Sequence, residues 1–295
     1  MMTPPLVEQV RSFNRTVTQR VGALQHDYLG RHRPLGESRL LFEIGSKGAS
    51  AATLRARLGL DSGYLSRLLR SLERQGLVET LKLTTDGRTR RVELTQKGHA
   101  ELDALDRGSD ELALSILDPL SERQRERLAA SMFEVERLLC ASAVAIASEP
   151  ATGKAAQYCL GEYYRELGKR FDAGFDVKLS LAPSLAEFSP PSGTFLVARL
   201  YGEPVGCGGL KPISAKAAYL KRMWIAPSLR GLGLARRLLG ALEESARAMG
   251  YSMVRLETNE ALTEAQQLYR SSGYREVRPF NDEHYAHHWY EKALP

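Results

Sequence analysis

One stretch near residue 230 constrains the fold of this chain more than any other feature. A strand-like run, AYLKRMWIAP at residues 218–227, is followed by SLRGLGLA at 228–235 and by the helix-forming run RRLLGALEESARAM. Two glycines in a tight turn let successive backbone N–H groups converge on one point, and the next helix adds the positive end of its dipole. The pattern predicts an anion site, best suited to a pyrophosphate, in a domain that mixes strands and helices.

The length and composition indicate two folded domains. A chain of 295 residues is about twice the usual domain length, and 43% hydrophobic with 26% charged residues excludes a mainly disordered protein. We expect a first domain over residues 1–147, a linker over 148–157 that contains the polar run SEPATGK, and a second domain over 158–295. Three scattered cysteines exclude a disulfide framework, and no apolar run is long enough to cross a bilayer. We therefore expect a cytoplasmic protein.

The first domain is expected to be mainly α-helical with one hairpin. Apolar residues at spacings of three and four predict a long helix over 7–28, and the turn Asp86-Gly87 separates two strand-like runs. The expected elements, in order, are helices over 7–28, 38–44, 51–58 and 63–75, strands over 77–84 and 90–94, and helices over 95–117 and 121–147. Two short helices joined at Gly59 and followed by a hairpin form the layout of a winged helix-turn-helix.

The charge of this domain indicates a polyanionic partner. The formal net charge of the whole chain is +6, and the basic excess is concentrated between Lys47 and Lys97. Side chains on the outer face of the fourth helix and at the hairpin can reach the phosphates and base edges of double-stranded DNA. These candidates are Ser62, Tyr64, Ser66, Arg67, Arg70, Arg88, Arg90 and Arg91. The alternative is a basic surface that faces solvent, on a domain that serves only for dimerisation.

Two segments of the first half resemble the MarR family of bacterial transcription regulators. They are GYLSRLLRSLERQGLVE at residues 63–79 and DGRTRRVELTQKG at residues 86–98. The resemblance covers about residues 5–147. It implies a homodimer, formed through the first and last helices, that reads a pseudo-palindromic DNA site.

The second half resembles the GNAT family of N-acetyltransferases. Its acetyl-coenzyme A signature is matched by Arg230, Gly233 and Ala235, and the run LETNEALTEAQQLYRSSGYREV at residues 256–277 matches the strand and helix that follow in the family. The resemblance implies an α/β domain with a mixed sheet. It also implies acetyl-CoA as the acyl donor, held by backbone and side-chain groups of Met223, Trp224, Ile225, Arg230, Gly231, Leu232, Gly233, Leu234, Ala235, Arg236 and Asn259.

The resemblance also implies a catalytic acid but leaves the base open. Tyr269 would face the sulfur and protonate the departing thiolate. Many members of the family carry a glutamate on the central strand as proton acceptor, and Tyr219 occupies that place here. Glu257, Glu203, Glu162 or a chain of waters could serve instead.

Two hypotheses of function follow. In the first, the protein is a DNA-binding regulator whose second domain transfers acetyl from acetyl-CoA to an amine on a small molecule or a protein lysine. In the alternative, the second domain is a non-catalytic sensor of acyl-CoA, which the missing strand glutamate would explain. No metal is expected, because His284, His287 and His288 lack a fourth ligand, and Cys207 between two glycines is expected in the core.

Overall fold

The computed structural model describes residues 4–25, 27–82, 90–172, 174–180 and 184–295. The chain divides into two compact units, residues 1–132 and 133–295, and each is described by itself. This division lies before the linker expected at residues 148–157. In the structure those residues form the end of a strand, a turn and the start of a helix. Among the described helices, none combines the length and the apolar character that a membrane span requires.

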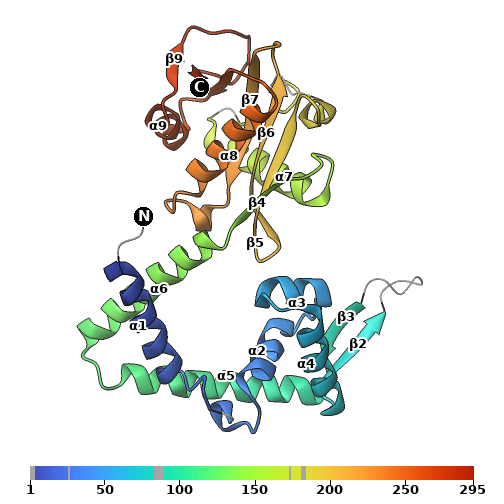
Figure 1. Ribbon diagram of the computed structural model, residues 1–295, viewed down its shortest axis with the longest axis vertical. Coiled ribbons are helices and arrows are strands. Elements are labelled where there is room, and N and C mark those ends of the chain that lie inside the picture. Colours follow the sequence, from blue (N-terminus) through green and yellow to red (C-terminus); the bar gives the residue numbers. More distant parts are fainter. Residues whose placement is uncertain (1–3, 26, 83–89, 173, 181–183) are drawn as a thin grey trace. The chain divides into compact units, whose positions relative to one another are not determined.

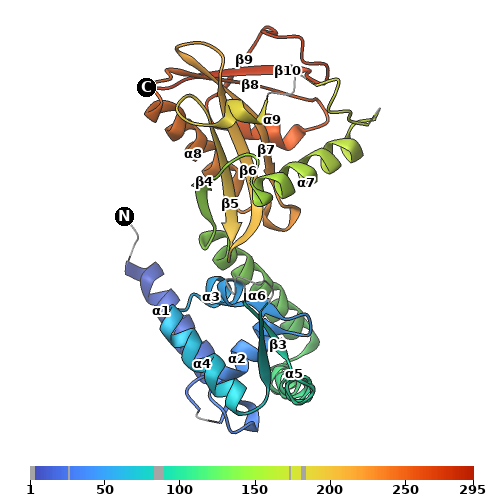
Figure 2. The ribbon, with the colours of Figure 1, turned by 90° about the vertical axis from the view of Figure 1, so that its right-hand side faces the viewer.

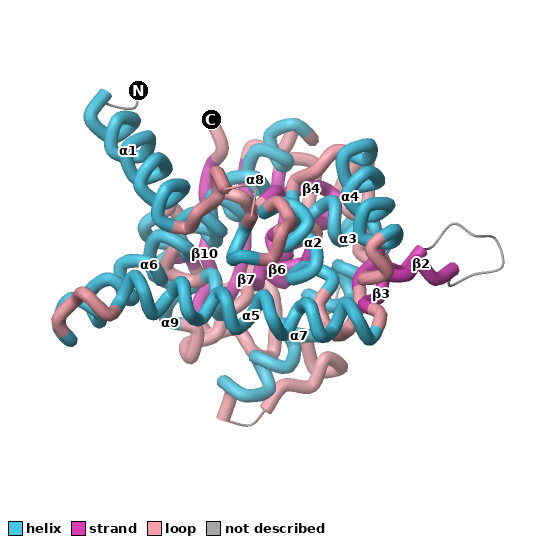
Figure 3. The backbone as a smooth tube through the Cα atoms, turned by 90° about the horizontal axis from the view of Figure 1, so that it is seen from below, coloured by secondary structure: helices cyan, strands magenta, loops and turns pink. Residues whose placement is uncertain are grey.

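The first unit is mainly helical and contains one small sheet. Its elements are α1 (Pro4–Arg20), a 3₁₀ turn (Tyr28–Gly30), α2 (Leu35–Ile44), β1 (Ala49–Ser50), α3 (Ala51–Leu58), α4 (Ser62–Arg74), β2 (Val78–Lys82), β3 (Arg90–Leu94), α5 (Gln96–Leu117) and the first part of α6 (Glu122–Ser142). The three strands pair in the order β1-β3-β2. The β2–β3 hairpin extends outward from the helices (Figure 3).

Local sequence chemistry sets the helix-turn-helix. The Ser50 hydroxyl caps α3 by accepting from the Thr53 N–H at 3.1 Å, and Asp61 caps α4 by accepting from the Tyr64 N–H at 2.9 Å. Gly59 ends α3 with φ of +63°, a conformation that costs glycine little. The core of the unit is built from leucines and valines of α2 to α5, including Leu40, Leu54, Leu72, Leu77, Val92 and Leu105.

The second unit is a seven-stranded mixed sheet covered by helices on both faces. Its strands are β4 (Ala145–Ser148), β5 (Thr194–Leu200), β6 (Glu203–Pro212), β7 (Ala217–Ile225), β8 (Met253–Thr258), β9 (Arg275–Val277) and β10 (His288–Ala293), in the order β4-β5-β6-β7-β8-β10-β9. The β7–β8 pair is parallel and the others are antiparallel. Figures 1 and 2 show α7 (Lys154–Arg170) and α8 (Leu234–Ala248) on opposite faces of the sheet. Helix α9 (Thr263–Ser271) follows β8 in the chain.

Two helices predicted from periodicity end earlier than expected. The helix predicted over 7–28 ends at Arg20, before Gly22 with φ of +68°. The helix predicted over 121–147 ends at Ser142, and Ala145–Ser148 form β4 instead. This segment pairs with Leu196–Arg199 of β5 and its neighbour Val144 is buried in the core, so sheet pairing overrides the helical propensity of the alanines.

Candidate functional site

The turn between β7 and α8 carries unpaired backbone donors. Gly231 and Gly233 both have φ of +77°, which glycine adopts without the steric cost of a side chain. The Arg230 guanidinium donates to the Ile225 carbonyl at 3.0 and 2.9 Å and so holds the turn against the strand. Within the described part of the chain, the backbone N–H groups of residues 231–236 donate to no protein acceptor. Such a row of donors at the start of a helix is what an anion requires.

Beside this turn, β7 and β8 part from each other. They pair only from Ala217–Met253 to Tyr219–Arg255, although β7 continues to Ile225 and β8 to Thr258. On the β8 side, the Met223–Ile225 edge has no strand partner among the described residues. Arg222, just before this edge, has φ of +60° and lies where β7 shifts its register against β6. The open edge is suited to an extended ligand that adds to it as a strand would.

A large cavity joins the turn to the open edge. Its volume is about 570 Å³, within the range of ligand sites. Nine of the residues predicted to hold the cofactor line it: Met223, Trp224, Ile225, Arg230, Gly231, Gly233, Leu234, Ala235 and Arg236. Leu232 packs instead against the core, and Asn259 lines a neighbouring cavity.

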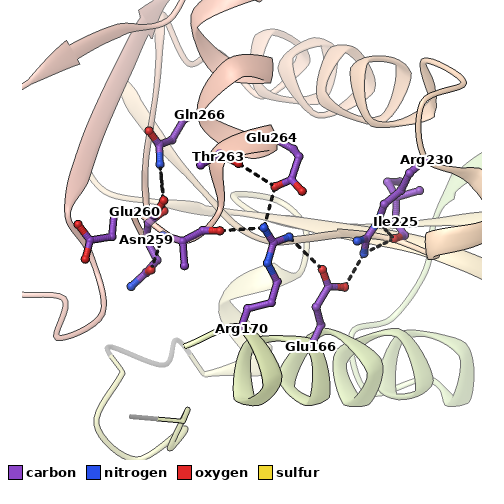
Figure 4. Close-up of polar contacts among 10 residues, drawn as sticks. Glu166, Arg170, Ile225, Arg230, Asn259, Glu260, Thr263, Glu264 and Gln266 are labelled. Atoms are coloured by element: carbon purple, nitrogen blue, oxygen red, sulfur yellow. Dashed lines mark hydrogen bonds and ion pairs between the residues drawn. The ribbon is translucent and has the colours of Figure 1, made fainter. Parts of the chain in front are cut away.

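A polar network ties α7 and α9 to the wall of this cavity (Figure 4). Glu166 of α7 accepts from the Trp224 indole at 2.9 Å and from the Arg230 guanidinium. Arg170, one turn further along α7, donates to the Ala261 carbonyl and to Glu264, both at 2.8 Å. Burial by itself would raise the pKa of Glu166, but its arginine partners and the indole hold that pKa below the usual value.

The first turn of α8 adds positive charge that no carboxylate neutralises in the described residues. Arg236 donates to the carbonyl and hydroxyl oxygens of Ser271, and Arg237 to the carbonyls of Ala141 and Val144. Cations at this end of a helix oppose its dipole. An anion bound at the turn would remove that penalty.

A second, smaller cavity lies on the other side of the same wall. It measures about 100 Å³ and shares six lining residues with the large cavity: Tyr163, Leu167, Met223, Leu262, Ala265 and Tyr269. The two spaces therefore adjoin at the open edge of β7. A donor in one and an acceptor in the other would meet at this wall.

Glu257 brings a buried carboxylate to the smaller cavity. Its side chain is 8% exposed and pairs with Lys221 at 3.0 Å, and Lys221 also contacts Glu283 at 2.7 Å. The Tyr219 hydroxyl donates to Glu257, so the tyrosine at the place of the family's strand glutamate holds a carboxylate from the adjacent strand. Burial raises the pKa of Glu257, and Lys221 opposes the rise. Glu203 and Glu162, the other carboxylates considered from the sequence, line neither cavity.

Tyr269 lies at the junction of the two cavities. Its ring is buried among Tyr274 and Tyr290, with centroids at 5.8 and 5.9 Å. Burial raises the pKa of its hydroxyl above the usual value, and the nearby charge of Glu257 adds to the rise. The phenol is therefore protonated at neutral pH, as a proton donor must be.

The Asn259 side chain is occupied by the protein itself. Its amide nitrogen donates to the Tyr285 carbonyl and its oxygen accepts from the Ala261 N–H, both at 2.8 Å. The first bond joins the end of β8 to the segment before β10, and the second closes a local turn after β8. In the structure Asn259 thus shapes the smaller cavity.

Sequence reasoning missed most of the smaller cavity. Lys221 and Arg222 lie within the predicted strand run at residues 218–227, yet nothing in the sequence marked them as lining residues. Aromatic rings from two parts of the chain that are far apart in sequence also meet there, Tyr163, Tyr164, Phe171 and Phe175 from α7 and the segment after it, and Tyr285 from the segment before β10. Only the tertiary fold brings them together.

The outer face of α4 is exposed as the DNA hypothesis requires. Leu65, Leu68 and Leu72 are buried, whereas the five candidates on this helix, Ser62, Tyr64, Ser66, Arg67 and Arg70, are exposed. The Arg67 guanidinium lies over the Tyr64 ring at 5.6 Å. Neither Arg67 nor Arg70 forms an ion pair within the described residues.

The hairpin candidates are described only in part. Arg88 and the side chain of Arg90 lie outside the described residues. Arg91 bonds to Glu93 at 2.7 Å and to the Lys47 carbonyl, so its guanidinium lies on the sheet. Among the side chains that are described, no group of three or more His, Cys, Asp or Glu is placed to hold a metal ion, and Cys207 is fully buried.

Comparison with known proteins finds similarity in both halves. Residues 161–274 match the family model described as "Acetyltransferase (GNAT) family", and residues 31–89 match that of the "MarR family". An IAA acetyltransferase of Azospirillum brasilense is 37% identical over 139 residues, which are 46% of this chain and 88% of that protein. The uncharacterized N-acetyltransferase YjgM of Escherichia coli is 34% identical over 38% of this chain and 70% of its own length. A GNAT-family acetyltransferase structure from Staphylococcus aureus covers 52% of this chain and all of its own, with 21% identity and a TM-score of 0.46.

Proposed function

Because this chain belongs to the GNAT family of acetyltransferases and matches the MarR family at residues 31–89, we propose that it is a DNA-binding regulator that transfers acetyl from acetyl-CoA to an amine. The acetyl-CoA pyrophosphate would bind at the turn of residues 230–236. The pantetheine arm would lie along the Met223–Ile225 edge of β7.

One observation carries the transferase proposal. The six backbone N–H groups of residues 231–236 lack a protein acceptor in the described chain, and five of these residues line the large cavity. A diphosphate satisfies such donors with charge-assisted hydrogen bonds, which are stronger than neutral ones. The cations of Arg236 and Arg237, which have no carboxylate partner in that same part of the chain, support the same ligand.

A Gly233→Ala variant tests this site. Gly233 lines the large cavity, and a Cβ there would meet no protein atom within 4 Å, so the added methyl group would take up space at the proposed phosphate site. We expect acetyl-CoA to bind at least about tenfold more weakly by calorimetry, because one hydrogen bond to a charged group is worth about 1.5–3 kcal/mol.

The matched control is Gly250→Ala. Gly250 also has a positive φ, of +87°, and open space around a Cβ, but it lies beyond the other end of α8. Both variants pay the same backbone strain of about 1–2 kcal/mol. Equal loss of acetyl-CoA affinity in the two variants would contradict the proposed phosphate site.

The proposed reaction is direct attack of a neutral amine on the thioester. The amine nitrogen adds to the thioester carbonyl carbon to give a tetrahedral oxyanion, and Glu257 takes the proton of the attacking amine. The C=O bond then re-forms as the C–S bond breaks, and Tyr269 gives its proton to the leaving thiolate. Backbone donors at the open edge of β7 would stabilise the oxyanion. The sensor alternative was suggested by Tyr219, which stands where many family members carry a glutamate. In this proposal Glu257, which accepts from the Tyr219 hydroxyl, supplies the base instead.

A Tyr269→Phe variant tests the proposed acid. We expect kcat to fall by about 10²-fold, the lower end of the range for proton transfer, because a thiolate leaves readily without full protonation. Release of free coenzyme A thiol measures the rate, and calorimetry checks that acetyl-CoA still binds. Tyr290→Phe is the control, since Tyr290 is fully buried beside Tyr269 but lines neither cavity. A Tyr269→Phe rate equal to that of the control would exclude the phenol as the acid.

For the first unit we propose a homodimer on double-stranded DNA in the cytoplasm, with α4 in the major groove. The apolar side chains of α1 support the dimer, because Leu6, Val7, Val10, Phe13 and Val17 are between 37% and 61% exposed. Such a continuous apolar face is typical of a protein interface. The exposed arginines of α4 support the contact with DNA.

A further inference from the structure

The smaller cavity has an aromatic wall. Tyr164 stacks on Phe175 with centroids 5.7 Å apart, and Phe175 and Phe171 pack on Tyr285 at 4.8 and 5.5 Å. These rings come from α7, from the segment after it and from the segment before β10. A wall of this kind favours an apolar or aromatic body in the bound molecule.

Arg222 places a cation at the same wall. Its guanidinium lies over the Tyr164 ring at 5.5 Å and over the Phe188 ring at 5.7 Å, and the residue is half-buried. These two rings orient the planar group. In the described chain no carboxylate pairs with Arg222, whereas the adjacent Lys221 pairs with both Glu257 and Glu283. Arg222 is thus the cation of this cavity that has no protein counter-ion within the described residues.

The backbone at Arg222 indicates that its position is specific. Its φ of +60° is uncommon for a residue with a side chain and stores strain of about 1–3 kcal/mol. The register shift of β7 against β6 occurs here, so the guanidinium and the open edge of β7 are set by the same irregularity. An arginine held by stacking presents its remaining N–H groups in a fork that matches a carboxylate.

We propose that the acetyl acceptor is an amine that also carries a carboxylate and an apolar or aromatic side chain, as a free amino acid does. The Arg222 guanidinium binds the carboxylate, the aromatic wall takes the side chain, and the amine points to Glu257 and the junction at Tyr269. The inference rests on the proposed acetyl transfer. In that reaction the amine nitrogen forms the amide bond, the thioester C–S bond breaks, and the carboxylate of the acceptor is unchanged.

Pairs of acceptors that differ only in the carboxylate test the proposal on the full chain. The pairs are phenylalanine with phenethylamine, leucine with isoamylamine, and Nα-acetyl-lysine with its amide; coenzyme A release measures kcat and KM. We expect kcat/KM to favour phenylalanine and leucine over their decarboxylated partners by at least about tenfold, as one charge-assisted hydrogen-bonded pair implies.

Variants of Arg222 assign this preference to the guanidinium. In Arg222→Met, which keeps the length and apolar stem, the preference should fall to about one, mainly through a higher KM for the carboxylate-bearing acceptor. Arg222→Lys should retain part of it, because a lysine keeps the charge but loses the bidentate fork. Calorimetric binding of acetyl-CoA to each variant shows whether the neighbouring large cavity is intact.

The outcomes separate the two levels of the proposal. Turnover of phenethylamine or of the lysine amide at rates equal to the amino acids would overturn the carboxylate class and leave acetyl transfer standing. A preference that survives in Arg222→Met would overturn the role of Arg222. Binding of acetyl-CoA without turnover of any acceptor would overturn the transferase proposal itself, and the present inference with it.

Discussion

A Glu257→Gln variant is expected to lose about 10²- to 10⁴-fold in kcat/KM, the range for loss of a positioned general base. Glutamine keeps the size of the side chain and can still accept from the Tyr219 hydroxyl, but it cannot take a proton from the attacking amine. Lys221 retains Glu283 as a partner at 2.7 Å, so the variant does not leave that buried cation alone. Acetyl-CoA binding should persist, because Glu257 does not line the large cavity.

The pH profile gives a second measurement of the same residue. Burial raises the pKa of Glu257, so its carboxyl group stays protonated to a higher pH than an ordinary glutamate, whose pKa is about 4.3. A base works only when deprotonated. The wild-type rate should therefore fall on acidification while exposed glutamates are still ionised, and Glu257→Gln should lack this step.

Glu291→Gln is the matched control. Glu291 lies opposite Arg255 on the neighbouring β10, is 8% exposed and pairs with Arg255 and Arg275, yet it lines neither cavity. Both variants replace a glutamate that is 8% exposed and paired with a cation by glutamine. Any loss of stability that comes from removing a buried charge should therefore appear in both variants. A similar loss of rate in Glu291→Gln and Glu257→Gln would contradict the assignment of the base.

The double variant Arg67→Ala/Arg70→Ala is expected to weaken DNA binding by about 2–6 kcal/mol, roughly thirtyfold or more, because an arginine that reads guanine contributes about 1–3 kcal/mol. Both side chains are exposed on α4 and make no ion pair in the described chain. The measurement is fluorescence anisotropy on a duplex enriched from a random-sequence pool with the full-length chain. Where a lost contact is to a phosphate, the slope of log K against log salt should fall by about 0.9.

Arg39→Ala/Arg107→Ala removes the same charge from exposed positions of α2 and α5, outside the first and last helices that are expected to form the dimer. Long-range attraction to DNA falls equally in the two double variants, whereas groove contacts are lost only with Arg67 and Arg70. Binding that is equally weakened in both would show general attraction to a basic protein. Binding unchanged in both would favour a domain that serves only for dimerisation.

Much of the fold could be predicted from local patterns. The helices predicted over 51–58 and 63–75 match α3 and α4 to within one residue at each end, since helix ends depend on neighbouring groups such as Gly59 and the caps that the structure shows at Ser50 and Asp61. The strand, turn and helix around Gly231 and Gly233 were also predicted, because a glycine turn before a helix is a local feature. The short strand β4 was missed: its alanines suit a helix, and only pairing with β5 makes the segment extended.

The sequence by itself determined the parts of this protein that depend on residues close in the chain: the helix-turn-helix, the two-glycine turn with its row of backbone donors, and the tyrosine in place of the strand glutamate. Only the tertiary structure decided the rest of the site. It placed Glu257 against Tyr219 and Lys221, and it set the Arg222 guanidinium on the rings of Tyr164 and Phe188. The physical reason is that burial, ion pairing and ring stacking depend on distances between segments far apart in sequence, which no local pattern encodes.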